Sequence, residues 1–404
     1  MYVALSAHRP LTHTASQRAG HAIRDMGESF RWLLTTSRLN VLLVFIPLGV
    51  LAKWLDWGSL AIFTLNFLAI IPLAKLLGDA TEQVSIPLGQ TVGGLLNATY
   101  VRPVAVLWLT CSFGNAVELI VAVVALLQGQ LRIVQMSLIG SILSNLLLVL
   151  GCSFFAGGIY QPENLFAQTA AQASGSIMTL GCFTMVVPAA YWASAHSDKV
   201  ILPVVEAMKH HTDEGNVTAG LLFISRGTSI FLLCIYAGYI YFQLRTHNFL
   251  FAETEAEEGG EREEQKMTPQ SSILALLIIT VITSMNADYL VSAIDDVANE
   301  YNISKPFIGI VLLPIVGNAA EHVTSVWMAA KNKMEIALGV AIGSSIQISL
   351  GLIPALVVVG WLIGQPLTLF FQNFETVTLV VSVLLVNTLI QDGKSNYLGA
   401  CLRR

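Results

Sequence analysis

Charged side chains are scarce in this sequence and unevenly placed. They make up 12% of the 404 residues, whereas a typical soluble domain carries about 25%. Five arginines fall in the first 38 residues, seven glutamates fall in the stretch 253–264, and long apolar runs separate these clusters. This pattern excludes an ordinary globular enzyme, a nucleic-acid binder and a disordered chain. It indicates a polytopic membrane protein in contact with the lipid bilayer, without a nucleic-acid partner.

Cysteine is also sparse and forms no motif. The chain has five cysteines and no C-x-x-C spacing. Thiolate and imidazole groups are not clustered, so no soft-metal site is expected.

Ten apolar runs are long enough to approach or exceed the roughly 20 residues that a helix needs to cross a bilayer. They cover residues 39–55, 58–77, 86–127, 131–156, 168–193, 219–244, 271–296, 305–330, 335–362 and 372–391. The short alternating segments of membrane β-barrels are absent, so the spans are predicted to be helical. The leading arginines place the N-terminus in the cytosol.

Two segments resemble each other at a fixed offset of 203 residues. Gly114–Glu118 reads G-N-A-V-E and Gly317–Glu321 reads G-N-A-A-E, and each has a Gly-Ser pair 26 residues after its first glycine. Five spans separate the two copies, and an odd number reverses the second one. The fold class is therefore an all-α polytopic membrane protein with an inverted repeat of five transmembrane helices, which is typical of secondary transporters.

A weaker sequence similarity, which does not follow the 203-residue offset, relates Ala80–Gln83 to Ala293–Asp296. It makes Glu82, Asp295 and Asp296 candidate acids for gating or for cation access.

The predicted organisation follows from these features. It comprises a disordered cytosolic tail (1–38), an extra first transmembrane helix (39–57), the first repeat (58–244), a cytosolic acidic loop or helix (245–270), the second repeat (271–391) and a C-terminal tail (392–404).

The two motif glutamates carry the chemistry. A carboxylate deep in a bilayer is costly and rarely present without a partner or a function. Asn115 and Glu118 are three residues apart, as are Asn318 and Glu321, so each pair projects from one helix face. Supporting oxygen donors follow in each repeat, namely Ser141, Ser144 and Asn145 in the first, and Ser344, Ser345 and Gln347 in the second. Two carboxylates with amide, hydroxyl and carbonyl oxygens form the ligand set of a hard divalent cation, with calcium favoured.

Other readings of these polar residues are open. Asn, Ser and Glu also hold transmembrane helices together, although matched glutamates in two inverted halves favour an ion site. His322 follows Glu321 but has Leu119 at its repeat position, so we interpret it as a tuning or packing residue. The acidic residues of the central loop are typical of a solvated loop, or of a regulatory cation site beside a cation pathway. They are Glu253, Glu255, Glu257, Glu258, Glu261, Glu263 and Glu264.

Over about residues 39–397 the sequence resembles the calcium/proton exchangers of the calcium:cation antiporter superfamily, most closely the fungal vacuolar members. The resemblance lies in F-G-N-A-V-E-L-I (Phe113–Ile120), S-R-G-T-S-I (Ser225–Ile230) and V-G-N-A-A-E-H-V-T-S (Val316–Ser325). It implies a vacuolar antiporter, not an enzyme, that moves calcium, with manganese as a further candidate, out of the cytosol in exchange for protons. It also implies that Glu118 and Glu321 bind cation and proton alternately, and that Glu253–Glu264 form a regulatory acidic helix.

Two departures from this family stand out. Gly93 precedes Gly114 by 21 residues, whereas Gly309 precedes Gly317 by 8, so residues 100–112 are predicted to be a 13-residue insertion. The codons for the two ends of this segment can contain the splice signals of an intron, so the insertion would fit a short retained intron. The family has eleven spans, so the last helix of the second repeat is expected to be missing.

Rival functions are a sodium-driven calcium exchanger and a non-transporting sensor derived from an exchanger. An intramembrane hydrolase is disfavoured because the motifs H-E-x-x-H and G-x-S-x-G are absent.

Overall fold

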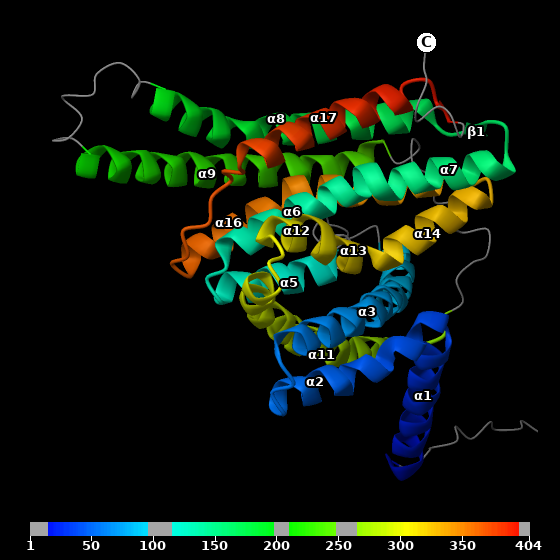
Figure 1. Cartoon of the computed structure of the whole chain (residues 1–404). Coiled ribbons are helices and arrows are strands. Elements are labelled where there is room, and N and C mark those ends of the chain that lie inside the picture. Colours follow the sequence, from blue (N-terminus) through cyan, green and yellow to red (C-terminus); the bar gives the residue numbers. More distant parts are fainter. Residues whose placement is uncertain (1–14, 96–114, 198–209, 248–264, 396–404) are drawn as a thin grey trace, which may run out of the picture.

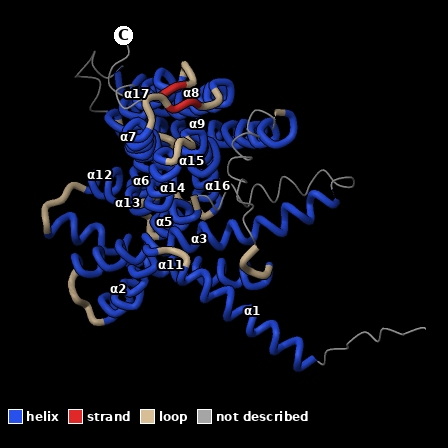
Figure 2. Tube along the Cα trace, turned by 90° about the vertical axis from the view of Figure 1, so that its right-hand side faces the viewer, coloured by secondary structure: helices blue, strands red, loops and turns tan. Residues whose placement is uncertain are grey.

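The computed structural model describes residues 15–95, 115–197, 210–247 and 265–395, and these are almost entirely helical (Figures 1 and 2). Helix is favoured because lipid offers no hydrogen bonds to backbone groups, so each segment must satisfy its own. The elements of the first half are α1 (Ala15–Thr35), the 3-10 helix η1 (Arg38–Val44), α2 (Phe45–Trp54), α3 (Ser59–Leu95), α5 (Ala116–Leu127), α6 (Leu131–Leu143), the π-helical η2 (Ser144–Val149), α7 (Leu150–Tyr160), β1 (Asn164–Leu165), α8 (Gln168–Ser197), α9 (His210–Tyr241) and the π-helical η5 (Phe242–Thr246).

The second half repeats much of this order. Its elements are α11 (Pro269–Glu300), α12 (Lys305–Phe307), the π-helical η7 (Ile308–Leu312), α13 (Leu313–Gly317), α14 (Ala319–Ala330), α15 (Met334–Ile346), the π-helical η8 (Gln347–Leu352), α16 (Ile353–Leu362), α17 (Asn373–Ile390) and β2 (Lys394–Ser395).

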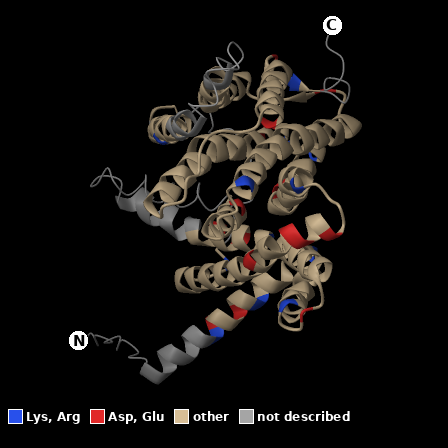
Figure 3. Cartoon of the chain, turned by 60° about the vertical axis from the view of Figure 1, so that its left-hand side comes forward, with Lys and Arg blue, Asp and Glu red and all other residues tan. Residues whose placement is uncertain are grey.

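The prediction of an all-helical membrane protein is confirmed. Seven helices in the described residues are long and apolar enough to cross a membrane, or up to nine if each of two bent helix pairs is one span. Figure 3 shows few charged residues along the helices of the bundle. The third predicted run, 86–127, lies partly outside the described residues, and the predicted insertion 100–112 lies wholly outside them. The C-terminal end of this run is described, and it forms the short apolar helix α5.

The 203-residue offset of the motifs extends to the helix boundaries. Helices α5 and α14 begin 203 residues apart, and so do α6 and α15. The π-helical segments η2 and η8 begin and end at the same offset. The two halves therefore share local structure around the motif glutamates as well as sequence.

Helices α2, α3 and α11 pack together on one side of the bundle, while α8, α9 and α17 lie at the opposite edge (Figure 1). Fully buried Asn66 of α3 lies against Gly49 of α2, where an added Cβ would come within 2.7 Å of the Asn66 Oδ1 atom. Between these layers α14 packs against α7 and α15. Helix α5 packs against α6 and α11. The two helices that carry the motif glutamates therefore lie between the outer layers (Figure 1).

The N-terminal region differs from its prediction. Residues 1–38 were expected to be disordered, but Ala15–Thr35 form α1. Although its composition is polar, this segment has apolar residues at helical spacing (Met26, Phe30 and Leu33). Phe30 and Leu33 join the hydrophobic core, and α1 packs against α3 and α11. The chain then turns by 99° into the segment Arg38–Trp54. The predicted first transmembrane helix, 39–57, is divided into η1 and α2.

A second difference is a short strand pair. The prediction contained helices only, yet β1 and β2 pair antiparallel, with Asn164 opposite Ser395. The pair joins the segment after α7 to the segment after α17.

Alanine substitution should affect thermal stability differently at the two glycines of the Gly-Ser pairs, Gly140 and Gly343. A Cβ on Gly140 would lie 2.4 Å from the carbonyl oxygen of Ile310, whereas a Cβ on Gly343 would meet nothing within 4 Å. Alanine gains up to about 1 kcal/mol of helix propensity at either site, but overpacking costs about 1–3 kcal/mol at the first. We expect Gly140→Ala to lower the midpoint of thermal unfolding of the detergent-solubilised protein, and Gly343→Ala, its matched control, to leave it unchanged or higher. Equal unfolding midpoints for the two variants would contradict the close contact between α6 and η7.

Candidate cation-binding site

Glu118 and Glu321 lie in the first turns of α5 and α14. Each helix begins after an asparagine N-cap, Asn115 or Asn318, and both asparagines are almost fully buried. The first N–H groups of a helix and its dipole favour negative charge at this position. The G-N-A-x-E motif therefore builds a helix N-terminus that can hold a carboxylate inside the bundle.

The two motifs meet in space. Glu118 is only 8% exposed, and its Oε1 atom lies 2.7 Å from the position that a Cβ on Gly317 would occupy. Gly317 is the first residue of the second motif and directly precedes Asn318, the N-cap of α14. The missing side chain of Gly317 thus makes room for the carboxylate contributed by the other repeat.

Hydrogen bonds join the helices around the glutamates. The Ser344 hydroxyl donates to Glu321 Oε1 over 2.6 Å. Asn318 Nδ2 donates to the Ser141 carbonyl oxygen over 3.2 Å, and Asn115 Nδ2 donates to Gln347 Oε1. The last two bonds cross between the repeats, so polar groups of residues 177 and 232 positions apart form one cluster.

Several oxygens of this cluster are buried without a hydrogen-bond partner among the described residues. They are Oδ1 of Asn115, Asn145 and Asn318, Oγ of Ser144, and Oε2 of Glu321. Leaving a buried polar atom unpaired costs about 1–3 kcal/mol, so such a group of acceptors indicates a ligand-binding function. Ser144 and Gln347 begin the π-helical segments η2 and η8, a feature often found at functional sites.

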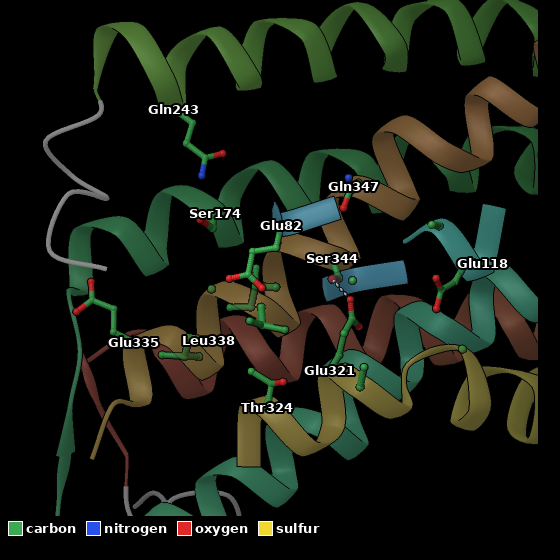
Figure 4. Close-up of a pocket in the computed structure, with 18 of the residues that line it drawn as sticks. Glu82, Glu118, Ser174, Gln243, Glu321, Thr324, Glu335, Leu338, Ser344 and Gln347 are labelled. Carbon is green, nitrogen blue, oxygen red and sulfur yellow. Dashed lines mark hydrogen bonds between the residues drawn. The ribbon is translucent and has the colours of Figure 1, made fainter. Parts of the chain in front are cut away.

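A cavity of about 630 Å³ leads to this cluster. Figure 4 shows Glu335 at one end, Glu82 between, and then Glu321 and Glu118 at the other end. Beyond Glu118 there is a pocket of only about 20 Å³, lined by apolar side chains that include Ile70, Val121 and Leu290. Among the described residues, the glutamates therefore border a large cavity on one side and a small, mostly apolar pocket on the other.

The structure brings most of the predicted ligands together, but not all. Glu118, Glu321, Ser344, Gln347 and Glu82 line the large cavity. Ser141 lines the small pocket with Glu118. Ser345 is fully buried away from the cavity, because its hydroxyl donates to the Ala341 carbonyl oxygen of its own helix over 2.8 Å.

Other predicted residues lie away from the cavity. Asp295 pairs with Lys305 over 2.9 Å and accepts from Gln130 over 3.0 Å, and Asp296 is exposed. Asp295 thus holds the end of α11 to α12 and to the turn before α6. His322 contacts the Asn318 carbonyl oxygen through Nδ1 at 2.7 Å, next to the site but outside the cavity lining. The acidic cluster Glu253–Glu264 lies outside the described residues.

Three charged residues of the cavity were missed by the sequence reasoning: Lys75, Asp79 and Glu335. The spacing of Lys75, Asp79 and Glu82 along α3 was a usable signal, because residues i, i+4 and i+7 share one helix face. Glu335 had no such signal, since its repeat position holds Arg132, a residue of opposite charge.

Comparison with known families decides the identity of this fold. The family model described as sodium/calcium exchanger protein matches residues 58–245 and 271–402. The chain belongs to this family. A vacuolar calcium ion transporter of Schizosaccharomyces pombe is 48% identical over 91% of this exchanger and 82% of the relative. A vacuolar cation/proton exchanger of Oryza sativa subsp. japonica is 41% identical over 92% of this chain and 84% of its own length.

Solved structures support the same assignment. The Ca2+/H+ antiporter protein YfkE matches with a TM-score of 0.67 and 30% identity, covering 90% of this exchanger and 94% of that chain. An H+/Ca2+ exchanger named CAX matches with a TM-score of 0.61 and 12% identity, covering 93% and 86%. The second likeness shows the shared fold alone.

The contact between Glu118 and Gly317 generates a prediction. Gly317→Ala would push the flexible carboxylate of Glu118 aside rather than disturb the backbone, so we expect about tenfold weaker calcium binding with little change in thermal stability. Gly78→Ala is a matched control, because Gly78 lines the same cavity and its added Cβ would meet nothing within 4 Å. Equilibrium binding of radioactive calcium to the purified variants measures the effect. If Gly317→Ala bound calcium as tightly as the wild type, the contact between Glu118 and Gly317 would not be part of the cation site.

Proposed function

We propose that this exchanger is a calcium/proton antiporter, in which Ca²⁺ and H⁺ compete for Glu118 and Glu321. The observation that carries the proposal is the meeting of two glutamates, buried Glu118 and partly buried Glu321, one from each repeat, in the lining of a single cavity. The related YfkE and the Oryza sativa relative carry printed names of a Ca2+/H+ antiporter and a cation/proton exchanger.

The donor set suits calcium. Calcium takes six to eight oxygen ligands in flexible geometry, from carboxylates, amide carbonyls and water. Glu118 and Glu321 would supply the charge, while Asn115, Asn318 and Ser344 supply neutral oxygens nearby.

Exchange follows from sharing one site. A protonated glutamate carries no charge and cannot hold a divalent cation, so proton binding releases calcium and calcium binding excludes protons. The cavity on one side and the apolar closure on the other support alternating access. In that scheme helices move against one another around a fixed central site.

The direction of transport is part of the proposal. On the topology inferred from the leading arginines, the cavity opens to the cytosol, because Glu335 at one end of the cavity lies in the first turn of α15, next to the loop that joins α14 to α15. We propose that calcium enters there and leaves into the vacuole, in keeping with the vacuolar name of the Schizosaccharomyces pombe relative. Manganese remains a further candidate substrate, and the acidic cluster Glu253–Glu264 a candidate regulatory site.

A sodium-driven exchanger is the second candidate, favoured by the family description itself. It would need ligands for sodium in addition to those for calcium, and the oxygens of Ser144 and Asn145 offer two. The driving gradient separates the two candidates.

We therefore expect vesicles containing this chain to accumulate calcium when a pH gradient is imposed and not when a sodium gradient is imposed. Glu118→Gln and Glu321→Gln should each reduce pH-driven uptake to the level of empty vesicles, because glutamine keeps the size but cannot bind or release a proton. Glu163→Gln, an exposed carboxylate in the loop before α8, is the control and should transport normally. Uptake driven by sodium would favour the second candidate, and calcium binding without uptake under either gradient would favour a sensor.

A further inference from the structure

Helix α3 presents a row of charged side chains to the cavity. Lys75, Asp79 and Glu82 are spaced by four and three residues and all line the cavity that leads to Glu321. At 1.5 Å per residue, the row covers about 10 Å of the route along the helix axis. The motif glutamates thus lie behind a series of other charges on the same route.

Lys75 and Asp79 form an ion pair within this row. The Lys75 ammonium donates to Asp79 Oδ1. The Lys75 side chain is 33% exposed, whereas that of Asp79 is only 7% exposed. The second oxygen, Asp79 Oδ2, is buried and has no hydrogen-bond partner among the described residues. The carboxylate is therefore anchored in the wall with one acceptor unused, while the lysine reaches it from the open cavity.

A lysine on a cation route requires an explanation. Charged side chains within a membrane span are expensive and mark ion pathways, and an uncompensated ammonium there would repel an incoming divalent cation. Asp79 neutralises this charge by pairing with it. Because the lysine side chain is long and flexible, it can leave the carboxylate without movement of the helix.

Release of Lys75 would create a second ion site. Residues three apart on a helix are neighbours, with Cβ atoms about 5–6 Å apart, so Asp79 and Glu82 can face the same ion. Two carboxylates on one side and water from the cavity on the other suit a hydrated divalent cation. Such a site binds weakly, as a transfer point must.

We propose that Asp79 is a transient divalent-cation site on the route to Glu321, and that Lys75 is a tethered cation that occupies it until calcium arrives. This inference rests on the proposed function, because it takes the cavity as the route of calcium. It assigns to the pair a role in setting the calcium concentration at which the exchanger works.

The two halves of the pair should respond with opposite sign. Asp79→Asn leaves an unpaired ammonium in the cavity and should raise the calcium concentration for half-maximal uptake at least tenfold. Lys75→Gln exposes the Asp79 carboxylate and should lower that concentration about threefold or more. The double variant Lys75→Gln/Asp79→Asn removes both charges and should lie within about threefold of the wild type. Uptake into vesicles over a range of calcium concentrations gives all three values.

A purely structural ion pair predicts a different result. Either single variant would then reduce expression and thermal stability, and the double variant would be no better than the worse single one. That outcome would overturn the proposal, as would an unchanged calcium dependence in Asp79→Asn. Glu28→Gln is the matched control, because Arg24 and Glu28 form an exposed ion pair of the same i, i+4 spacing on α1, away from the cavity.

A binding measurement separates this inference from the proposed function. In the Glu118→Gln/Glu321→Gln background, radioactive calcium bound to the purified full-length protein reports on sites other than the motif glutamates. We expect a weak component of binding that Lys75→Gln strengthens about threefold and Asp79→Asn removes, whereas any binding by the acidic cluster Glu253–Glu264 should be the same in both variants. Absence of binding in the background carrying Lys75→Gln would overturn the Asp79 site alone. Absence of calcium uptake by the wild type under any gradient would instead overturn the proposed function.

Discussion

The structure depends on holding two carboxylates inside a membrane protein. Glu118 and Glu321 are placed in the first turns of α5 and α14, where helix N-termini favour negative charge. Gly317 allows Glu118 to approach the second motif, and Ser344 donates to Glu321. The asparagine caps then tie each motif to the other repeat. Helix breaks, small residues and π-helical segments around the site all serve this arrangement.

Equivalent positions of the two halves have different surroundings. Gly140 is packed against the backbone of Ile310, while Gly343 borders the open cavity. Arg132 is held by buried Glu375 over 2.5 Å, whereas Glu335, 203 residues later, lies at the cavity mouth. A repeated sequence thus adopts a closed arrangement in one half and an open one in the other. An alternating-access transporter needs both arrangements to be attainable, because exchanging them moves the opening to the other side.

The sequence alone was sufficient for the membrane-protein class, and it singled out the two motif glutamates as candidates. A shortage of charge and long apolar runs leave only helices that satisfy their own backbone in lipid. Two glutamates in matched motifs are costly enough to indicate a function wherever the helices lie. The 203-residue offset also anticipated the shared boundaries of α5 with α14 and of η2 with η8. By contrast, α1 was missed, because its apolar face is narrow and its overall composition polar.

Tertiary structure decided which polar residues share the cavity and which side of the site is open. Ser345 and Asp295 fit the sequence pattern, yet one bonds within its own helix and the other pairs with Lys305. Lys75, Asp79 and Glu335 belong to the cavity because helices distant in sequence bring their faces together. Periodicity specifies the face of a helix on which a residue lies, but not which neighbour, lipid or cavity that face meets. That depends on packing between helices, and packing is a property of the whole chain.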